Sequence, residues 1–318
     1  MAKSYKQLYQ KLPAEIVDLL AEQYNPAELD RVFAGFMCER PVTLRVNRLK
    51  ADVRQVMEEL RRDNIKFERV LWYDDALVIK NVREKTLEEH ELYKQGLIYL
   101  QSLSSMIPPL VLQPQSGAKV LDLTAAPGGK STQIAALMGN QGYLLANEIN
   151  HIRAERLKYN VDRQGATIIE VREGDGKRLE AQYGQFFDAV LLDAPCSGVG
   201  LFWMENPQTY RSWSLRLMNQ LVKEQRKLLE TAYWALKPGG VLVYSTCTLT
   251  RPENEANVER FLNQFPETVR LEKLDFTLHG AEQVQRFQPI ENTKGNVMTI
   301  TPTAWYEGFF VAKFRKLM

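Results

Sequence analysis

The stretch Leu191-Leu192-Asp193-Ala194-Pro195-Cys196-Ser197-Gly198 decides the fold of this chain. It continues an apolar run that begins at Ala189 and ends in a carboxylate, a proline and a thiol. Proline cannot donate to a sheet ladder, so we expect a buried strand that ends at about Asp193. Open α/β sheets bind ligands at the carboxyl ends of their strands, where Asp193 and Cys196 would then lie. Taken alone, the stretch fits equally well a buried strand whose turn happens to contain a cysteine.

Strands and helices alternate on both sides of this stretch. Five apolar, β-rich segments are predicted strands, at 119–123, 143–147, 167–171, 188–193 and 241–245. Segments with helical spacing lie at 102–112, 131–137, 151–162 and 217–236, and residues 308–313 read as a last strand that closes the sheet. This alternation predicts an α/β fold with a Rossmann-like doubly wound parallel sheet over residues 96–318.

Residues 1–95 are expected to form a small α+β domain that binds RNA. Apolar residues at helical spacing, from Leu8 and Leu12 to Ile16 and Leu19, predict two short helices before residue 40. Strands are expected at 43–47, 67–71 and 77–79, and a helix at 52–60. The domain is rich in basic residues, which are Arg45, Arg48, Lys50, Arg54, Arg61, Arg62 and Lys66. They could follow a phosphate backbone, but interspersed acidic residues favour an ordinary solvated face.

Composition sets the broad class of the protein. The 318 residues are 25% charged and 45% hydrophobic, which is typical of a soluble globular protein of about two domains. The net charge is only +2, so affinity for RNA must come from local clustering of charge. No stretch approaches the ~18 apolar residues of a membrane-spanning helix, and we expect a cytoplasmic monomer with no membrane partner. Three scattered cysteines argue against a disulfide framework and against a metal site.

A glycine-containing turn follows the first predicted strand and predicts a nucleotide-like ligand. Small residues and two glycines in Thr124-Ala125-Ala126-Pro127-Gly128-Gly129-Lys130 let the backbone approach a ligand at the start of a helix. The turn matches neither the dinucleotide nor the Walker pattern. Acids at successive strand ends, Asp122, Glu148 and Asp175, suit a nucleoside with a neutral or cationic tail, such as S-adenosylmethionine. The residues assigned to this cofactor are Ala125, Ala126, Pro127, Gly128, Gly129, Lys130, Glu148, Arg153, Asp175, Gly176 and Asp193.

Three motifs together resemble a known family. Asp122-x-x-Ala125-Ala126-Pro127-Gly128-Gly129-Lys130, Asp193-Ala194-Pro195-Cys196-Ser197-Gly198 and Tyr244-Ser245-Thr246-Cys247-Thr248 are similar to motifs of the Sun-type (RsmB/RsmF-like) RNA 5-methylcytosine methyltransferases. The resemblance covers about residues 40–315. It implies a fold of the S-adenosylmethionine-dependent methyltransferase type and methyl transfer to carbon 5 of a cytosine in RNA, with ribosomal RNA favoured and transfer RNA possible. It also implies that Cys247 is the nucleophile and that Cys196 serves product release.

The chemistry of cytosine explains why two thiols and a carboxylate would be needed. Carbon 5 takes a methyl group only after a nucleophile, suitably a thiolate, has added to carbon 6. Asp193 would hold the ring nitrogen and amine of the base, and Lys130 could lower the pKa of a thiol. From the residues alone, either Cys196 or Cys247 could attack, because related DNA enzymes attack from a Pro-Cys motif. The absence of their Glu-Asn-Val motif favours the RNA assignment.

Other candidate residues receive weaker interpretations. Cys38 lies outside every motif and reads as a small buried hydrophobe. Trp203, Tyr210 and Trp213 follow Cys196 in a long loop and either stack on a flipped base or pack the loop. In the same loop, residues 202–207 lack the basic residues usual in the family, which puts the expected RNA contacts there in doubt.

A rival interpretation is a non-catalytic RNA-binding or ribosome-assembly factor that retains the fold. It predicts loss of the catalytic residues, whereas Lys130, Asp193, Cys196 and Cys247 are all present. The chain is also expected to end about where a catalytic core ends, without the added RNA-binding domain of several relatives that act on small-subunit ribosomal RNA.

Overall fold

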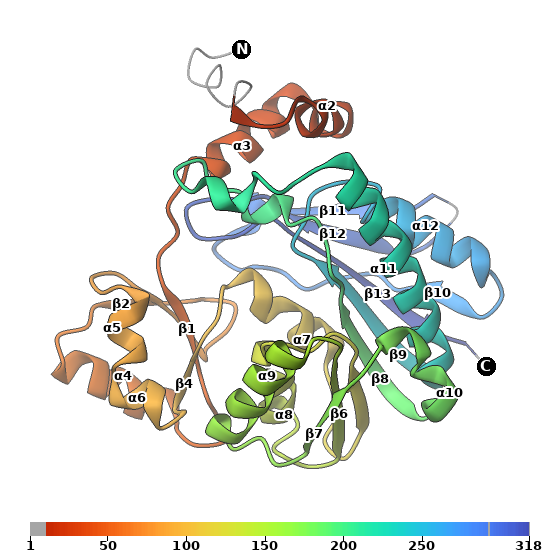
Figure 1. Cartoon of the computed structure of the whole chain (residues 1–318). Coiled ribbons are helices and arrows are strands. Elements are labelled where there is room, and N and C mark those ends of the chain that lie inside the picture. The colour runs from red at the N-terminus through yellow and green to blue at the C-terminus, as the bar shows by residue number, and fades with distance from the viewer. Residues whose placement is uncertain (1–10, 292, 318) are drawn as a thin grey trace.

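The computed structural model describes residues 11–291 and 293–317 of the chain, and Leu8 therefore lies outside the described residues. Two β-sheets form the framework (Figure 1). The smaller sheet has four strands in the order β2-β3-β1-β4, all of whose neighbours are antiparallel. Their bounds are Thr43–Val46 for β1, Phe67–Arg69 for β2, Ala76–Ile79 for β3 and Ile98–Leu100 for β4. Helices α4 (Val53–Arg62), α5 (Glu84–Glu88) and α6 (Glu91–Lys94) accompany this sheet.

The first two described helices pack away from the smaller sheet. Helices α2 (Ala14–Gln23) and α3 (Pro26–Phe36) lie beside the segment that follows Cys196, at the opposite end of the molecule from α4 (Figure 1). Their apolar faces share one buried cluster with Phe202 and Trp213. Asn25 caps α3 by accepting hydrogen bonds from the backbone amides of Ala27 and Glu28. The helical prediction for this region is confirmed, and the two helices pack against the segments that follow β8 and β9 rather than against the smaller sheet.

The larger sheet has nine strands and contains the predicted parallel core. The order is β11-β12-β13-β9-β8-β5-β6-β7, and β10 pairs with β13 off this path. Strands β7, β6, β5, β8 and β9 are parallel, which confirms the doubly wound α/β fold. The bounds are β5 Lys119–Asp122, β6 Tyr143–Glu148, β7 Ile169–Glu173, β8 Phe187–Asp193, β9 Leu236–Thr246, β10 Val269–Leu271, β11 Gln285–Pro289, β12 Asn296–Ile300 and β13 Phe309–Lys316.

The last strand does not close the sheet, so this prediction is wrong in its placement. Strand β13 lies antiparallel between β9 and β12, and β11 continues the sheet beyond β12. The continuous apolar run of β13 fits a strand that is buried on both faces, as interior strands are. Strand β11 carries polar residues and a proline, Gln285-Arg286-Phe287-Gln288-Pro289, a composition that gives almost no strand signal but suits a sheet edge.

Helices cover both faces of the larger sheet. Residues of β8 alternate between them: Leu191 belongs to the core under α7, α8 and α9, and Leu192 to the core under α11 and α12. The bounds are α7 Ile107–Leu112, α8 Gly129–Leu137, α9 His151–Gln164, α10 Glu180–Tyr183, α11 Leu215–Ala235 and α12 Glu255–Gln264. Within the described ranges, no helix combines the length and apolarity needed to cross a bilayer.

Arg45 joins the two sheets. Its side chain is fully buried, donates to Gln101 Oε1 at 3.0 Å and reaches Thr132 Oγ1 of α8 at 3.0 Å. Asn47 of the same segment donates to the backbone oxygens of Gly96 and Gln164, each at 2.8 Å. Arg45 is therefore a structural link rather than part of a solvated or phosphate-tracking face, because the side chain is inaccessible to a ligand.

Candidate active site

The predicted site residues lie together at the carboxyl ends of the parallel strands, because of the register between β8 and β9. Strand β8 ends at Asp193 and β9 at Thr246, and Asp193 is the parallel partner of Ser245. The loops that begin there carry Cys196 and Cys247 respectively. Because the strands are parallel and in this register, residues 51 positions apart in the sequence leave the sheet side by side.

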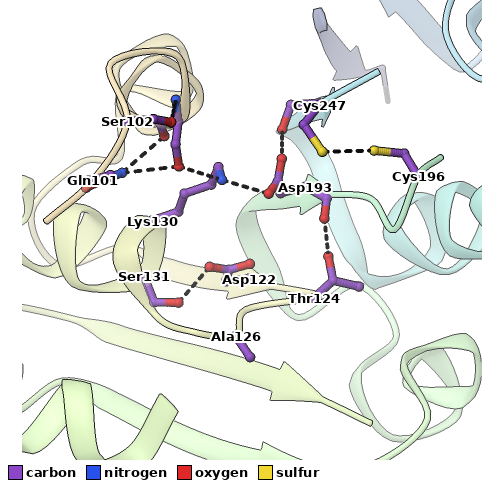
Figure 2. A network of polar contacts seen from close by, with 12 residues as sticks. Gln101, Ser102, Asp122, Thr124, Ala126, Lys130, Ser131, Asp193, Cys196 and Cys247 are labelled. Carbon is purple, nitrogen blue, oxygen red and sulfur yellow. Dashed lines mark hydrogen bonds and ion pairs between the residues drawn. The ribbon is translucent and has the colours of Figure 1, made fainter. Parts of the chain in front are cut away.

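The two cysteines are in direct contact. Cys196 Sγ lies 3.2 Å from Cys247 Sγ, and both residues are free thiols (Figure 2). The hydrogen bond with Cys247 and burial raise the pKa of the Cys196 thiol well above its usual value. The raised pKa means that Cys196 holds its proton, and in this contact either sulfur could be the donor.

Asp193 and Lys130 form a half-buried ion pair next to the thiols. Lys130 Nζ lies 2.7 Å from Asp193 Oδ2 and donates to Ser105 Oγ at 2.8 Å, whereas Asp193 Oδ1 accepts from Ser245 Oγ at 2.7 Å (Figure 2). Burial alone would lower the pKa of Lys130, but the Asp193 carboxylate outweighs burial, and the pKa is raised. Lys130 therefore stays charged, and its nearest anion is Asp193.

A cavity of about 810 Å³, open on one side to solvent, begins at the cysteines and extends along the strand ends. Its wall includes six of the residues assigned to a cofactor, together with both thiols: Ala126, Glu148, Arg153, Asp175, Gly176, Asp193, Cys196 and Cys247. A second cavity of about 710 Å³ shares Thr124, Ala126 and Asp193 with the first and is lined by Ala125, Pro127, Gly129 and Lys130. Gly128 lies behind this wall, where its φ of 107° at the start of α8 requires a glycine.

The polar groups of the first cavity fit S-adenosylmethionine. Glu148 is almost fully buried at the end of β6, where its Oε1 accepts from the amide of Asn150 at 2.9 Å. Arg153, the basic residue of the wall, lies 3.5 Å from Glu148 and donates to the carbonyl of Ala126 at 2.9 Å. Its charge is thus neutralised by Glu148. Carboxylates with a paired guanidinium suit ribose hydroxyls and an adenine better than phosphate groups.

Asp122 has a different environment from the other two strand-end acids. It is buried, and its Oδ2 accepts from Ser131 Oγ at 2.6 Å (Figure 2). Burial raises its pKa to about 7, although the Ser131 hydrogen bond and nearby Lys130 act in the opposite direction. Asp122 therefore anchors the start of α8 to β5.

Several polar residues around the site were missed by the sequence analysis. Ser105 holds Lys130, and Ser102 donates to Glu307 at 2.6 Å at the mouth of the second cavity. These serines precede the first parallel strand and belong to no recognised motif. Ser245, by contrast, is part of the quoted Tyr-Ser-Thr-Cys-Thr motif, and its position opposite Asp193 could have been found from strand register.

Two of the candidate aromatic residues pack the loop. Tyr210 and Trp213 are buried in the cluster that α2 and α3 form, so the alternative in which they stack on a base is wrong. Cys38 is half-buried and donates to the carbonyl of Ala34 at 3.3 Å, which corrects the expectation of a buried residue. It follows α3 in an exposed segment, so its surroundings cover only part of the side chain.

The histidines pair with carboxylates near the surface. His90 lies 2.9 Å from Asp63, His151 lies 3.0 Å from Glu173, and the ring of His279 faces Glu282. Within the described ranges, no three side chains of His, Cys, Asp or Glu are arranged to hold a metal ion.

Comparisons with known proteins match two separate stretches of the chain. Residues 109–315 match the family model of the 16S rRNA methyltransferase RsmB/F, and residues 12–84 match that of the ferredoxin-like domain of RsmF/B-like methyltransferases. The ribosomal RNA small subunit methyltransferase F of Pectobacterium atrosepticum is 35% identical over 316 residues, which are 96% of this chain and 63% of that protein. The Shewanella oneidensis protein of the same name is 39% identical over 299 residues, 92% of this chain and 61% of that protein. The chain thus spans less than two thirds of these relatives.

Solved structures agree with the fold. A methyltransferase homologue from Pyrococcus horikoshii superposes with a TM-score of 0.75 at 30% identity, covering 96% of this chain and 99% of that one. NSun6 from the same organism, solved with SFG, gives a TM-score of 0.83 at 22% identity over 98% of this chain and 100% of that one, a likeness of fold alone. The resemblance and the cofactor class inferred from the sequence are confirmed, since the chain belongs to the RsmB/F family of S-adenosylmethionine-dependent 16S rRNA methyltransferases.

Proposed function

We propose that this protein methylates carbon 5 of a cytosine in RNA through a covalent cysteine–cytosine adduct. The single observation that carries the proposal is the pair of thiols 3.2 Å apart at the end of the cofactor cavity, next to the Asp193–Lys130 ion pair. Methyl transfer to oxygen or exocyclic nitrogen needs no second thiol. Addition to a ring carbon followed by elimination uses one thiol for each task.

The cofactor residues are assigned by position in the wall of the first cavity. Glu148 would accept from the ribose hydroxyls and Asp175 from the adenine amine, while the turn 124–130 would approach the tail with its backbone. S-adenosylmethionine, when bound, supplies an electrophilic methyl group.

Attack begins at Cys247. Its thiolate, which accepts the hydrogen bond of the Cys196 thiol, forms a bond to carbon 6 of the base, and the ring electrons move toward carbon 5 and the ring nitrogen. Asp193 contacts that nitrogen and the amine, and Lys130 holds the Asp193 carboxyl group in place. Carbon 5 becomes nucleophilic and takes the methyl group.

Release then depends on Cys196. Once Cys247 is a thioether it carries no charge and accepts no proton, so the main cause of the raised pKa of Cys196 is removed. Cys196 can then lose its proton to solvent and take the proton from carbon 5. The bond between Cys247 and carbon 6 breaks, which restores the thiolate of Cys247 next to the protonated Cys196.

The proposed substrate is 16S ribosomal RNA, with transfer RNA as the alternative. Relatives named ribosomal RNA small subunit methyltransferase F support the first choice. We also propose that the stretch matching the ferredoxin-like domain, residues 12–84, contributes to RNA binding. Bisulfite sequencing of total RNA from cells with and without the gene identifies the target cytosine.

The direct test uses RNA prepared with cytosine that carries tritium on carbon 5. The proposed reaction releases one tritium into water for each methyl group transferred, because Cys196 exchanges its acquired proton with solvent. Methyl transfer from labelled S-adenosylmethionine without tritium release would assign the activity to another atom. No transfer to any RNA fraction would favour the non-catalytic factor.

A further inference from the structure

A buried carboxylate, Glu253, connects the two loops that carry the cysteines. It lies in the turn after Cys247, and its side chain is fully buried, although it lines neither of the two cavities described above. Its backbone oxygen accepts from Tyr244 Oη at 2.6 Å and from Asn257 Nδ2 at 3.2 Å, which fixes this turn to β9 and α12. The proposed chemistry does not use Glu253 directly.

Four donors surround the carboxylate. Oε1 accepts from the Ser197 amide at 2.8 Å and from Gln225 Nε2 at 3.0 Å. Oε2 accepts from the hydroxyl groups of Ser197 and Thr250, the latter at 2.7 Å. Within the described ranges no lysine, arginine or histidine forms an ion pair with Glu253. Burying a carboxyl group without a cationic partner costs free energy. The four neutral donors around Glu253 therefore do not serve to balance its charge, and they point to another role for this residue.

Ser197 links Glu253 to the two loops that carry the thiols. It follows Cys196 directly, and both its amide and its hydroxyl are held by the carboxylate. Its hydroxyl also lies 3.1 Å from Thr248 Oγ1, which follows Cys247 directly. Gln225 of α11 donates to the carbonyl of Pro195 at 2.9 Å, on the other side of Cys196. The backbone on both sides of Cys196 is thus tied to the same carboxylate.

We propose that Glu253 is a positioning residue that holds Cys196 against Cys247 through Ser197 and is needed for elimination of the adduct. This inference rests on the proposed function. Glu253 also contributes its negative charge to the raised pKa of Cys196, which helps that thiol to keep its proton until Cys247 has reacted. The attack step needs Cys247 alone and should tolerate loss of Glu253, whereas release needs Cys196 in place.

The test compares Glu253→Ala with Glu253→Gln. Glutamine can keep all four contacts, because its oxygen accepts from the Ser197 amide and Gln225, and its amide nitrogen donates to hydroxyls that can also accept. Alanine removes them. Glu259→Ala on α12, whose carboxylate pairs with exposed Arg251, is the matched surface control.

We expect turnover of Glu253→Ala to fall by about 100-fold, as for displacement of a reacting group by an ångström. Covalent protein–RNA adduct should accumulate on denaturing gels, and the affinity for S-adenosylmethionine should stay within about two-fold. The KM for RNA should fall together with kcat, because a step after attack limits turnover. Glu253→Gln and Glu259→Ala should turn over without adduct accumulation. Wild-type turnover of Glu253→Ala, a loss without adduct, or equal damage by glutamine would each overturn the proposal.

Two further variants keep the result decisive. If Glu253→Ala does not bind cofactor, Ser197→Ala serves in its place, because it removes only the two hydroxyl contacts with Glu253 and Thr248. Ser197→Ala should still accumulate adduct, and absence of adduct in that variant would overturn the proposal. Cys196→Ala reports on the proposed function itself. If that variant forms no adduct, the covalent mechanism fails whatever the Glu253 variants do.

Discussion

Cys196 Sγ and Cys247 Sγ lie 3.2 Å apart because the strands that precede them are parallel neighbours in register. This distance is too long for a disulfide and short enough for one shared proton. The hydrogen bond with Cys247 and burial raise the pKa of the Cys196 thiol, which supports the proposal that Cys196 keeps its proton while Cys247 attacks. Strand register thus brings together two thiols that the proposed mechanism uses in turn.

Replacing each cysteine should give opposite results. Cys247→Ala is expected to abolish both methyl transfer and adduct formation, since Cys247 is the proposed nucleophile and Cys196 is proposed to serve release. Cys196→Ala should still attack but fail to eliminate, so adduct accumulates. Denaturing gels of protein incubated with RNA and S-adenosylmethionine measure both outcomes.

Cys38→Ala is the matched control, because that half-buried thiol hydrogen-bonds only to the Ala34 carbonyl and lies outside both cavities. It should behave as wild type. An adduct formed by the Cys247→Ala protein would reverse the assignment of the two roles.

Asp193→Asn should reduce turnover while leaving cofactor binding intact. Asparagine keeps an oxygen for Ser245 but cannot balance the charge of Lys130 or stabilise a protonated ring nitrogen. Loss of one such electrostatic contact costs about 100-fold or more in kcat. Titration calorimetry with S-adenosylmethionine should give a Kd within a few-fold of wild type, and a collapse of affinity would place Asp193 in the cofactor site instead.

Glu148→Gln should weaken cofactor binding. A hydrogen bond to a charged group contributes about 1.5–3 kcal/mol, so the Kd for S-adenosylmethionine should rise by roughly 10-fold to 100-fold. Glu173→Gln is the matched control, because Glu173 is the parallel partner of Glu148 at the end of β7 but lies outside the cavity. Equal affinities for the two variants would remove Glu148 from the cofactor site.

The parallel core could be predicted from the sequence because most of its strands contain apolar, β-rich runs, although β7 alternates apolar with charged residues. Strand β8 and the residues at its end illustrate this. The pairing of Asp193 with Lys130 was not foreseen, because the sequence analysis directed the lysine toward a thiol. Which polar side chains meet across a cavity depends on tertiary packing, which local patterns do not encode.

The edge of the larger sheet and the network around Glu253 were beyond sequence reasoning for a related reason. Strand β11 is stabilised by its partner β12 rather than by its own composition. Glu253 and Gln225 are polar residues of a turn and of α11, yet both are fully buried. A buried polar residue whose partners come from distant segments gives no local signal.

Asp122 should make the stability of the protein depend on pH between about 4 and 7. Burial raises its folded pKa to about 7 from an ordinary value of 3.8, so the folded state binds this proton more tightly than the unfolded state. The stabilisation is complete below the unfolded pKa and is lost as the pH rises through the folded pKa. It amounts to at most about 4 kcal/mol.

Asp122→Asn removes this titration but keeps an acceptor for Ser131. From pH 5 to pH 8 the free energy of unfolding of the wild type should therefore fall more steeply than that of the variant. Urea titrations at both pH values measure how the free energy of unfolding of each protein changes with pH. The difference between the two changes cancels the pH-independent cost of the amide. It also cancels the contribution of Glu255, whose pKa burial likewise raises to about 7. Parallel slopes would mean that Asp122 is already ionised in the folded protein, with Lys130 close enough to compensate for its burial.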